Sequence, residues 1–169
     1  LLDTSKTLVF ATVRSASAEP ATTHVFTSLD DEQTISFVRF NASTSVEVEW
    51  MVVEFVSGVN IISGLTTFGD CTTTACRTKN ITLPQSLDLS RSVAFVSWKS
   101  YSDTTATTKD EMHIYTVEFA AANKIAIKRT DSTSAAFNDV YYQVIEFDEG
   151  VSVQSGNVNI VYNGSSYAT

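Results

Sequence analysis

Two glutamates and two arginines occupy matching positions in the two halves of this sequence. Glu54 and Glu146 each precede a phenylalanine at the end of an apolar run. If these runs are strands, each glutamate shares a face with apolar residues, as Arg39 and Arg129 do. A carboxylate on an apolar face could act as a catalytic acid with a raised pKa. Because an arginine recurs with each glutamate, we predict structural ion pairs instead, Arg39 with Glu54 and Arg129 with Glu146.

His24 and His113 also occupy matching positions, each before a β-branched residue and an aromatic residue. A metal site or a pH switch uses this residue type, but a strand histidine with a backbone or hydroxyl partner accounts for the pattern. The acidic runs 30–32 and 148–149 lack the ligand spacing of a calcium loop, so we expect solvated turns. No phosphate-binding loop, dinucleotide fingerprint or nucleophile elbow is present. We predict no catalytic residue, no metal site and no cofactor.

The two cysteines, Cys71 and Cys76, are separated by four residues. This is not the spacing of a redox Cys-x-x-Cys motif, and a zinc site would need further ligands, which lie far away in the sequence. The spacing predicts a local disulfide that closes a small loop, with two free thiols as the alternative. A disulfide indicates an oxidising location, outside the cell or on a cell or virion surface.

Two further sets of side chains could contact carbohydrate. Asn-x-Ser/Thr triplets make Asn41, Asn80 and Asn163 candidate glycosylation sites. Aromatic rings that could stack on a bound sugar are those of Trp98, Tyr101, Tyr141 and Tyr142. Exposed, coplanar rings would favour a binding module, and buried rings would favour a structural protein.

The matching residues belong to an internal repeat. Leu2–Phe10 resembles Leu87–Phe95, and Val52–Gly64 resembles Val144–Gly156, with the matching blocks in the same order. We predict a tandem duplication, with copy one at residues 1–77 and copy two at residues 78–169. The linker that carries the cysteines lies at about 64–86.

Each copy reads as five or six short strands with alternating β-branched or aromatic residues, separated by Ser, Thr, Asn, Asp and Gly. The predicted strands lie near 6–14, 23–28, 33–40, 45–56 and 58–63, and near 90–99, 112–119, 124–129, 139–147 and 150–155. The fold class is therefore all-β, with a small antiparallel β-sandwich or jelly-roll-like unit in tandem.

Charge and apolar pattern narrow the class of partner. The net charge of −8 argues against a nucleic-acid partner, and no apolar stretch is long enough to insert across a membrane. Several strands are apolar on both faces, which predicts contacts with another copy or subunit. We expect a non-enzymatic extracellular structural subunit that self-associates in a filament, surface layer or virion. The alternative is a carbohydrate-binding or adhesin module with glycans as partners.

A strand could pass from one subunit to the next. The strand-like segment 80–84 precedes copy two and has no counterpart before copy one. Copy one would then have an open sheet edge, which readily accepts another strand. We predict that residues 158–162 of a neighbouring subunit fill it, which would generate a filament. The alternatives are that residues preceding Leu1 have been cleaved, or that residues 64–70 cover the edge within the chain.

Overall fold

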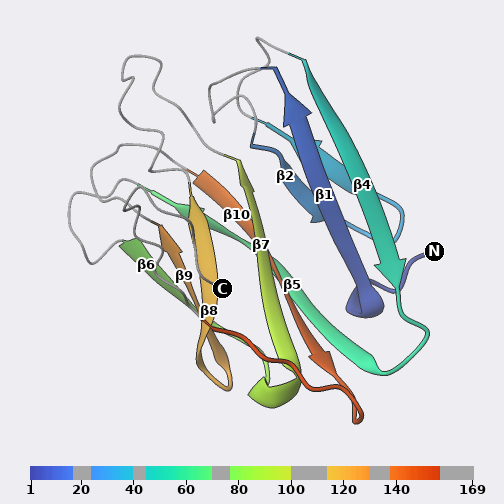
Figure 1. The fold of residues 1–169 in the computed structure, drawn as a ribbon, viewed down its shortest axis with the longest axis vertical. Helices are drawn as coiled ribbons and strands as arrows, with labels where there is room; N and C mark the ends of the chain where they lie inside the picture. The colour runs from blue at the N-terminus through green and yellow to red at the C-terminus, as the bar shows by residue number, and fades with distance from the viewer. Residues whose placement is uncertain (17–23, 40–44, 70–76, 100–113, 130–137, 157–169) are drawn as a thin grey trace, which may run out of the picture.

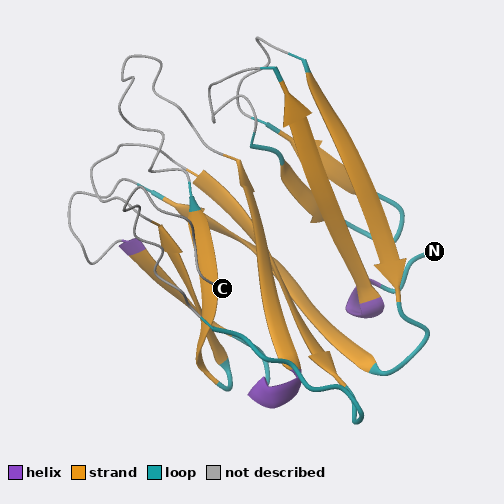
Figure 2. Ribbon diagram, viewed as in Figure 1, coloured by secondary structure: helices purple, strands orange, loops and turns teal. Residues whose placement is uncertain are grey.

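The computed structural model describes residues 1–16, 24–39, 45–69, 77–99, 114–129 and 138–156. Its regular secondary structure is β-strand, apart from short 3-10 turns (Figure 2). The elements are η1 (Thr4–Lys6), β1 (Thr7–Ser15), β2 (Phe26–Leu29), β3 (Ile35–Val38), β4 (Val46–Glu54), β5 (Val59–Phe68), β6 (Thr78–Thr82), η3 (Leu89–Arg91), β7 (Ser92–Lys99), β8 (Tyr115–Ala121), β9 (Lys124–Arg129) and β10 (Asn138–Phe147). All their pairings are antiparallel, as a fold with alternating short strands predicts.

The strands form a four-strand module and a six-strand module (Figure 1). In the four-strand module, β1 pairs with β4 and β2 pairs with β3, which gives two two-stranded sheets. In the six-strand module, the sheet β5-β10-β7 lies against the sheet β6-β9-β8. The pairings β7–β10 and β8–β9 correspond by sequence order to β1–β4 and β2–β3. The six-strand module has one strand more in each sheet, β5 and β6.

The main core lies between the two sheets of the six-strand module. Ile125 and Ile127 of β9 and Val140 and Val144 of β10 are fully buried there. β5 contributes Phe68 to this core, and β6 contributes Ile81 at its margin. A smaller cluster of Leu8, Ile61 and Ile145 joins the two modules.

The four-strand module meets the six-strand module through the edges of β1 and β2. The buried Gln143 side chain accepts a hydrogen bond from Val9 N (3.2 Å) and donates one to Thr7 O (3.3 Å). The Ser97 hydroxyl accepts from Thr27 N (3.2 Å) and donates to Thr27 O (2.8 Å). These side chains replace a neighbouring strand for the backbone groups of Thr7, Val9 and Thr27 at the junction.

Nine of the ten strands predicted from sequence have a counterpart in the structure, with shifted ends. The segment 80–84, predicted to be strand-like, overlaps β6, which pairs with β9. The predicted strand 150–155 is wrong, because Gly150 lies in a turn and the residues after it form no strand. Its counterpart β5 pairs with β10 in the six-strand module, and no equivalent neighbour lies beside 150–155 among the described residues.

Candidate functional site

A hydrogen-bonded turn precedes the first strand of the four-strand module. The Asp3 carboxylate accepts hydrogen bonds from Ser5 N (3.0 Å) and Ser5 Oγ (2.6 Å), and it forms an ion pair with Lys6 (3.0 Å). The Thr7 hydroxyl donates to Asp3 O (2.7 Å). The hydrogen bonds from Ser5 and Lys6 lower the pKa of Asp3.

The same contacts recur where the chain enters β7. The Asp88 carboxylate accepts from Ser90 N (3.0 Å) and Ser90 Oγ (2.6 Å) and forms an ion pair with Arg91 (3.0 Å). The Ser92 hydroxyl donates to Asp88 O (2.8 Å). These hydrogen bonds, led by those from Ser90, lower the pKa of Asp88. Both aspartates therefore organise a turn.

Glu54 and Glu146 each close one of these turns. Glu54 Oε1 accepts a hydrogen bond from Asp3 N (2.7 Å), and Glu146 Oε1 accepts one from Asp88 N (2.7 Å). The arginines predicted to pair with them are not part of these contacts. The buried Arg129 donates to Gly69 O (3.3 Å), and its guanidinium lies 5.6 Å from the centre of the Phe68 ring. Each glutamate accepts a hydrogen bond from a backbone N–H of a turn. Both glutamates are therefore turn-stabilising residues.

The candidate sugar-stacking rings that the structure describes pack inside the protein. Tyr141 is buried, and Trp98 and Tyr142 are half-buried against the main core. The Trp98 ring lies 5.7 Å from the Tyr115 ring and 5.3 Å from the His24 ring, with both pairs tilted. Rings held this way do not offer a flat stacking platform.

The remaining sequence candidates are mostly outside the described residues. These are Cys71, Cys76, Asn41, Asn163, Tyr101 and His113, together with the proposed donor strand 158–162. Asn80 is described and lies exposed on β6, opposite Ala126.

The acidic turn between β2 and β3 is held by its own hydrogen bonds. Asp30 accepts from the hydroxyls of Ser28 (2.5 Å) and Ser36, and Asp31 accepts from Gln33 N (2.8 Å), which lowers the Asp31 pKa. In the described ranges, no three His, Cys, Asp or Glu side chains are grouped so as to hold a metal ion. No helix within them is long and apolar enough to cross a membrane.

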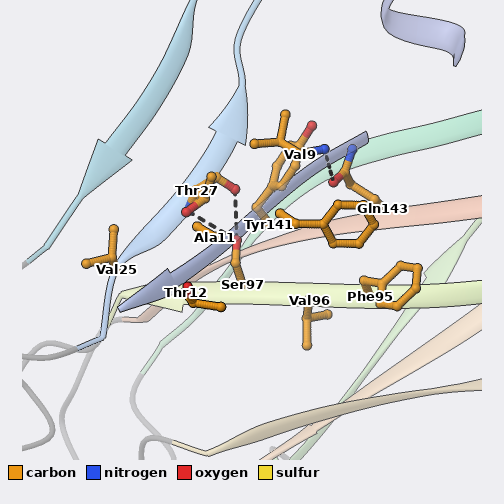
Figure 3. Close-up of a pocket in the computed structure, with 11 residues that line it drawn as sticks. Val9, Ala11, Thr12, Val25, Thr27, Phe95, Val96, Ser97, Tyr141 and Gln143 are labelled. Atoms are coloured by element: carbon orange, nitrogen blue, oxygen red, sulfur yellow. Dashed lines mark hydrogen bonds between the residues drawn. The ribbon is translucent and has the colours of Figure 1, made fainter. Parts of the chain in front are cut away.

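A groove of about 260 Å³ follows the junction of the two modules (Figure 3). Val9, Thr27, Ser97, Tyr141 and Gln143 line it. Gln143 and Ser97 bind backbone groups of Thr7, Val9 and Thr27 beside the groove, whereas the buried hydroxyls of Thr27 and Tyr141 have no hydrogen-bond partner among the described residues. The described lining contains no carboxylate, histidine or cysteine, and its chemistry is that of an interface packed between the two modules.

β3 and β4 of the four-strand module carry four exposed large apolar residues. Trp50 and Met51 of β4 are each 56% exposed, and Phe37 and Val38 of β3 are each 38% exposed. The rings of Phe37 and Trp50 lie 6.1 Å apart. Val38 and Met51, their neighbours on the same strands, point to the opposite strand faces. We call these four residues the open end.

Two unpaired strand edges border the open end. In the described part of the chain, β4 pairs only with β1 and β3 pairs only with β2. Unpaired N–H and C=O groups beside exposed apolar side chains favour the addition of a further strand. The open end thus combines the two features of an assembly surface, apolar area and free backbone hydrogen-bonding groups.

Comparison with known proteins finds no matching family model, no similar curated protein and no similar solved structure.

Proposed function

We propose that this chain is a non-enzymatic structural subunit that self-associates in an extracellular filament, surface layer or virion. The observation that carries the proposal is the open end, where apolar side chains lie beside two unpaired strand edges. Large exposed apolar patches next to such edges are uncommon on soluble monomers and are typical of interaction surfaces. Turn formation and packing account for the polar residues that could otherwise have suggested an enzyme.

The alternative of a carbohydrate-binding module receives less support. Its described candidate rings are buried or half-buried and tilted relative to their neighbours. The exposed rings of Phe37 and Trp50 are inclined to each other by 48°, so they do not form one flat face.

Light scattering coupled to gel filtration, with electron microscopy of the same fractions, tests the proposal. We expect the average mass to rise with protein concentration and ordered polymers to become visible. Serine at both Trp50 and Met51 should suppress this association. Leu65→Ser is the matched control, because Leu65 is 60% exposed but lies on β5, away from the open end. A protein that stays monomeric at the highest attainable concentration would contradict the proposal.

A further inference from the structure

β5 follows the last strand of the four-strand module in the chain but pairs in the six-strand module. It follows β4 after the turn at Gly58, which has a φ of 83°. It then pairs along its length with β10, from Val59 opposite Phe147 to Phe68 opposite Asn138. Without β5, the β7–β10 pair would be a two-stranded sheet like β1–β4.

Residues 150–156 repeat the start of β5. Gly58, Val59, Ser63 and Gly64 recur as Gly150, Val151, Ser155 and Gly156 at the same spacing. Gly150 also takes a positive φ, of 94°, so the chain turns after β10 as it does after β4.

Among the described residues of this subunit, 151–156 have no strand partner. One backbone hydrogen bond, from Val153 N to Ser90 O (2.8 Å), ties this segment to its own chain. All of its residues except Val153 are exposed. It is therefore a strand-like sequence with one backbone hydrogen bond to the described part of the chain.

The free edge of β4 matches the edge of β10 that β5 occupies. The Phe55 N–H donates to Lys6 O (2.9 Å), on the side of β1. Because successive residues of a strand point their N–H and C=O groups to opposite sides, those of Glu54, Val52 and Trp50 point away from β1. In the described part of the chain, these N–H and C=O groups form an unpaired edge that can accept a strand.

Gly156 supplies the most specific observation. In β5, Gly64 lies opposite Tyr142, and a Cβ on Gly64 would lie 2.4 Å from the tyrosine oxygen. A glycine is therefore required beneath that ring. Gly156 has open space where its Cβ would be, and its φ is not in the left-handed region. No contact among the described residues requires a glycine there.

We propose that residues 151–156 of one subunit pair antiparallel with β4 of a second subunit, as β5 pairs with β10. The inference rests on the proposed function and names its partner segment. The β5 register places Val151 opposite Phe55 and Gly156 opposite the exposed Trp50, so Gly156 gains the role that Gly64 has under Tyr142. The glycine makes room for the large ring at a sheet edge.

The same register extends the internal packing across subunits. Ile61 of β5 packs with Leu8 of the four-strand module and Ile145 of β10. Val153 takes the place of Ile61, between Val93 of its own subunit and Val53 of the next. Because donor and acceptor surfaces differ, the contact is head-to-tail and continues into an open polymer.

Two variants that block opposite ends of the contact test the proposal. Gly156→Val places a branched side chain beneath Trp50 and blocks the donor. Val52→Pro removes an outward N–H and blocks the acceptor, in a position where an edge strand tolerates proline. Each variant alone should raise the concentration needed for polymerisation by at least about tenfold. Mixed together, they should form a 1:1 dimer and nothing longer, because one intact donor meets one intact acceptor.

Controls separate assembly from folding. Gly156→Val should leave the thermal midpoint of the monomer unchanged, because its site is open in the subunit. Ser155→Val, one residue away and on the opposite face, should polymerise like the unmodified protein. Trp50→Lys is a second acceptor variant at an exposed side chain, for use if the proline lowers the thermal midpoint.

The outcomes distinguish this inference from the proposed function. If the unmodified protein polymerises but Gly156→Val and the acceptor variants polymerise equally well, strand pairing by 151–156 is wrong and self-association stands. A mixture of donor-blocked and acceptor-blocked protein that yields no dimer also overturns the inference. Symmetric dimers of Gly156→Val, formed by two β4 edges, would overturn it as well. A protein that never associates would overturn the proposed function itself.

Discussion

The four-strand and six-strand modules contain corresponding strand pairs but differ in how well their interiors are covered. Phe37 of β3 is 38% exposed, whereas Ile127, the matching residue of β9, is fully buried. Likewise, Trp50 of β4 is 56% exposed, whereas the matching Tyr142 of β10 is half-buried. β5 and β6 account for the difference, because each adds an outer strand to one sheet of the six-strand module.

This comparison indicates that four strands of this type do not close a sandwich. Their two sheets contact the neighbouring module through β1 and β2, where Gln143 and Ser97 satisfy the strand edges. The opposite edges, on β3 and β4, have no such side chains in the described part of the protein. The four-strand module therefore has one side that contacts the six-strand module and an opposite side with exposed strand edges.

The largest predicted effect concerns the two interiors. Ile127→Ala should lower the free energy of unfolding by about 2–5 kcal/mol, because it leaves a cavity in a close-packed core. Phe37→Ala should cost less than about 1 kcal/mol in the monomer, because solvent already reaches this ring. Urea unfolding at a concentration where the protein is monomeric measures both. Equal losses would show that the two interiors are covered to the same extent.

A smaller effect is expected at the two turns. Glu146→Ala should lower the free energy of unfolding by about 1 kcal/mol, because the Asp88 N–H loses a charged acceptor. Glu54→Ala should have a weaker effect in the same assay, because Glu54 is the more exposed of the two. Glutamine at either position keeps an acceptor oxygen and should recover part of the loss. If Glu54→Ala is the more damaging variant, solvent exposure does not set the strength of these contacts.

The strand pattern could be predicted from sequence because alternation and turn residues are local signals. Residues 124–129 were predicted as a strand and form β9 with the same ends. The equivalence of Glu54 and Glu146 was also visible, since both end matching apolar runs. Their partners could not be predicted, because a backbone N–H leaves no sign in the sequence and an arginine in a matching strand is the more obvious candidate.

The pairing of a strand from copy one with a strand from copy two could not be predicted from the sequence for a related reason. A repeat shows which segments match but not which neighbour each strand joins. Residues 58–64 and 150–156 share four residues at the same spacing, yet β5 pairs with β10 whereas 150–156 has no strand partner among the described residues. The burial of Tyr141 could not be predicted either. An aromatic residue on a strand has the same sequence pattern whether it packs in a core or binds a ligand.

The smallest predicted effect compares two matching ion pairs. Lys99 and Asp139 lie 2.8 Å apart with side chains 23% and 25% exposed, whereas Arg14 and Glu47 are 80% and 57% exposed. Burial acts to raise the pKa of Asp139, but hydrogen bonds from Lys99 and Thr67 outweigh it and leave the pKa below its ordinary value of 3.8.

A carboxylate whose pKa is lower in the folded state stabilises the fold above its unfolded pKa. That stability disappears as the pH falls through the folded pKa. Asp139→Asn should therefore lower the free energy of unfolding at pH 7 by less than about 1 kcal/mol, and the difference from the unmodified protein should shrink below pH 4. Glu47→Gln should change little at either pH, because solvent screens an exposed pair. Urea unfolding of the monomer from pH 7 to pH 2 measures both variants. A deficit for Asp139→Asn that persists undiminished at the lowest pH would assign its effect to packing and not to charge.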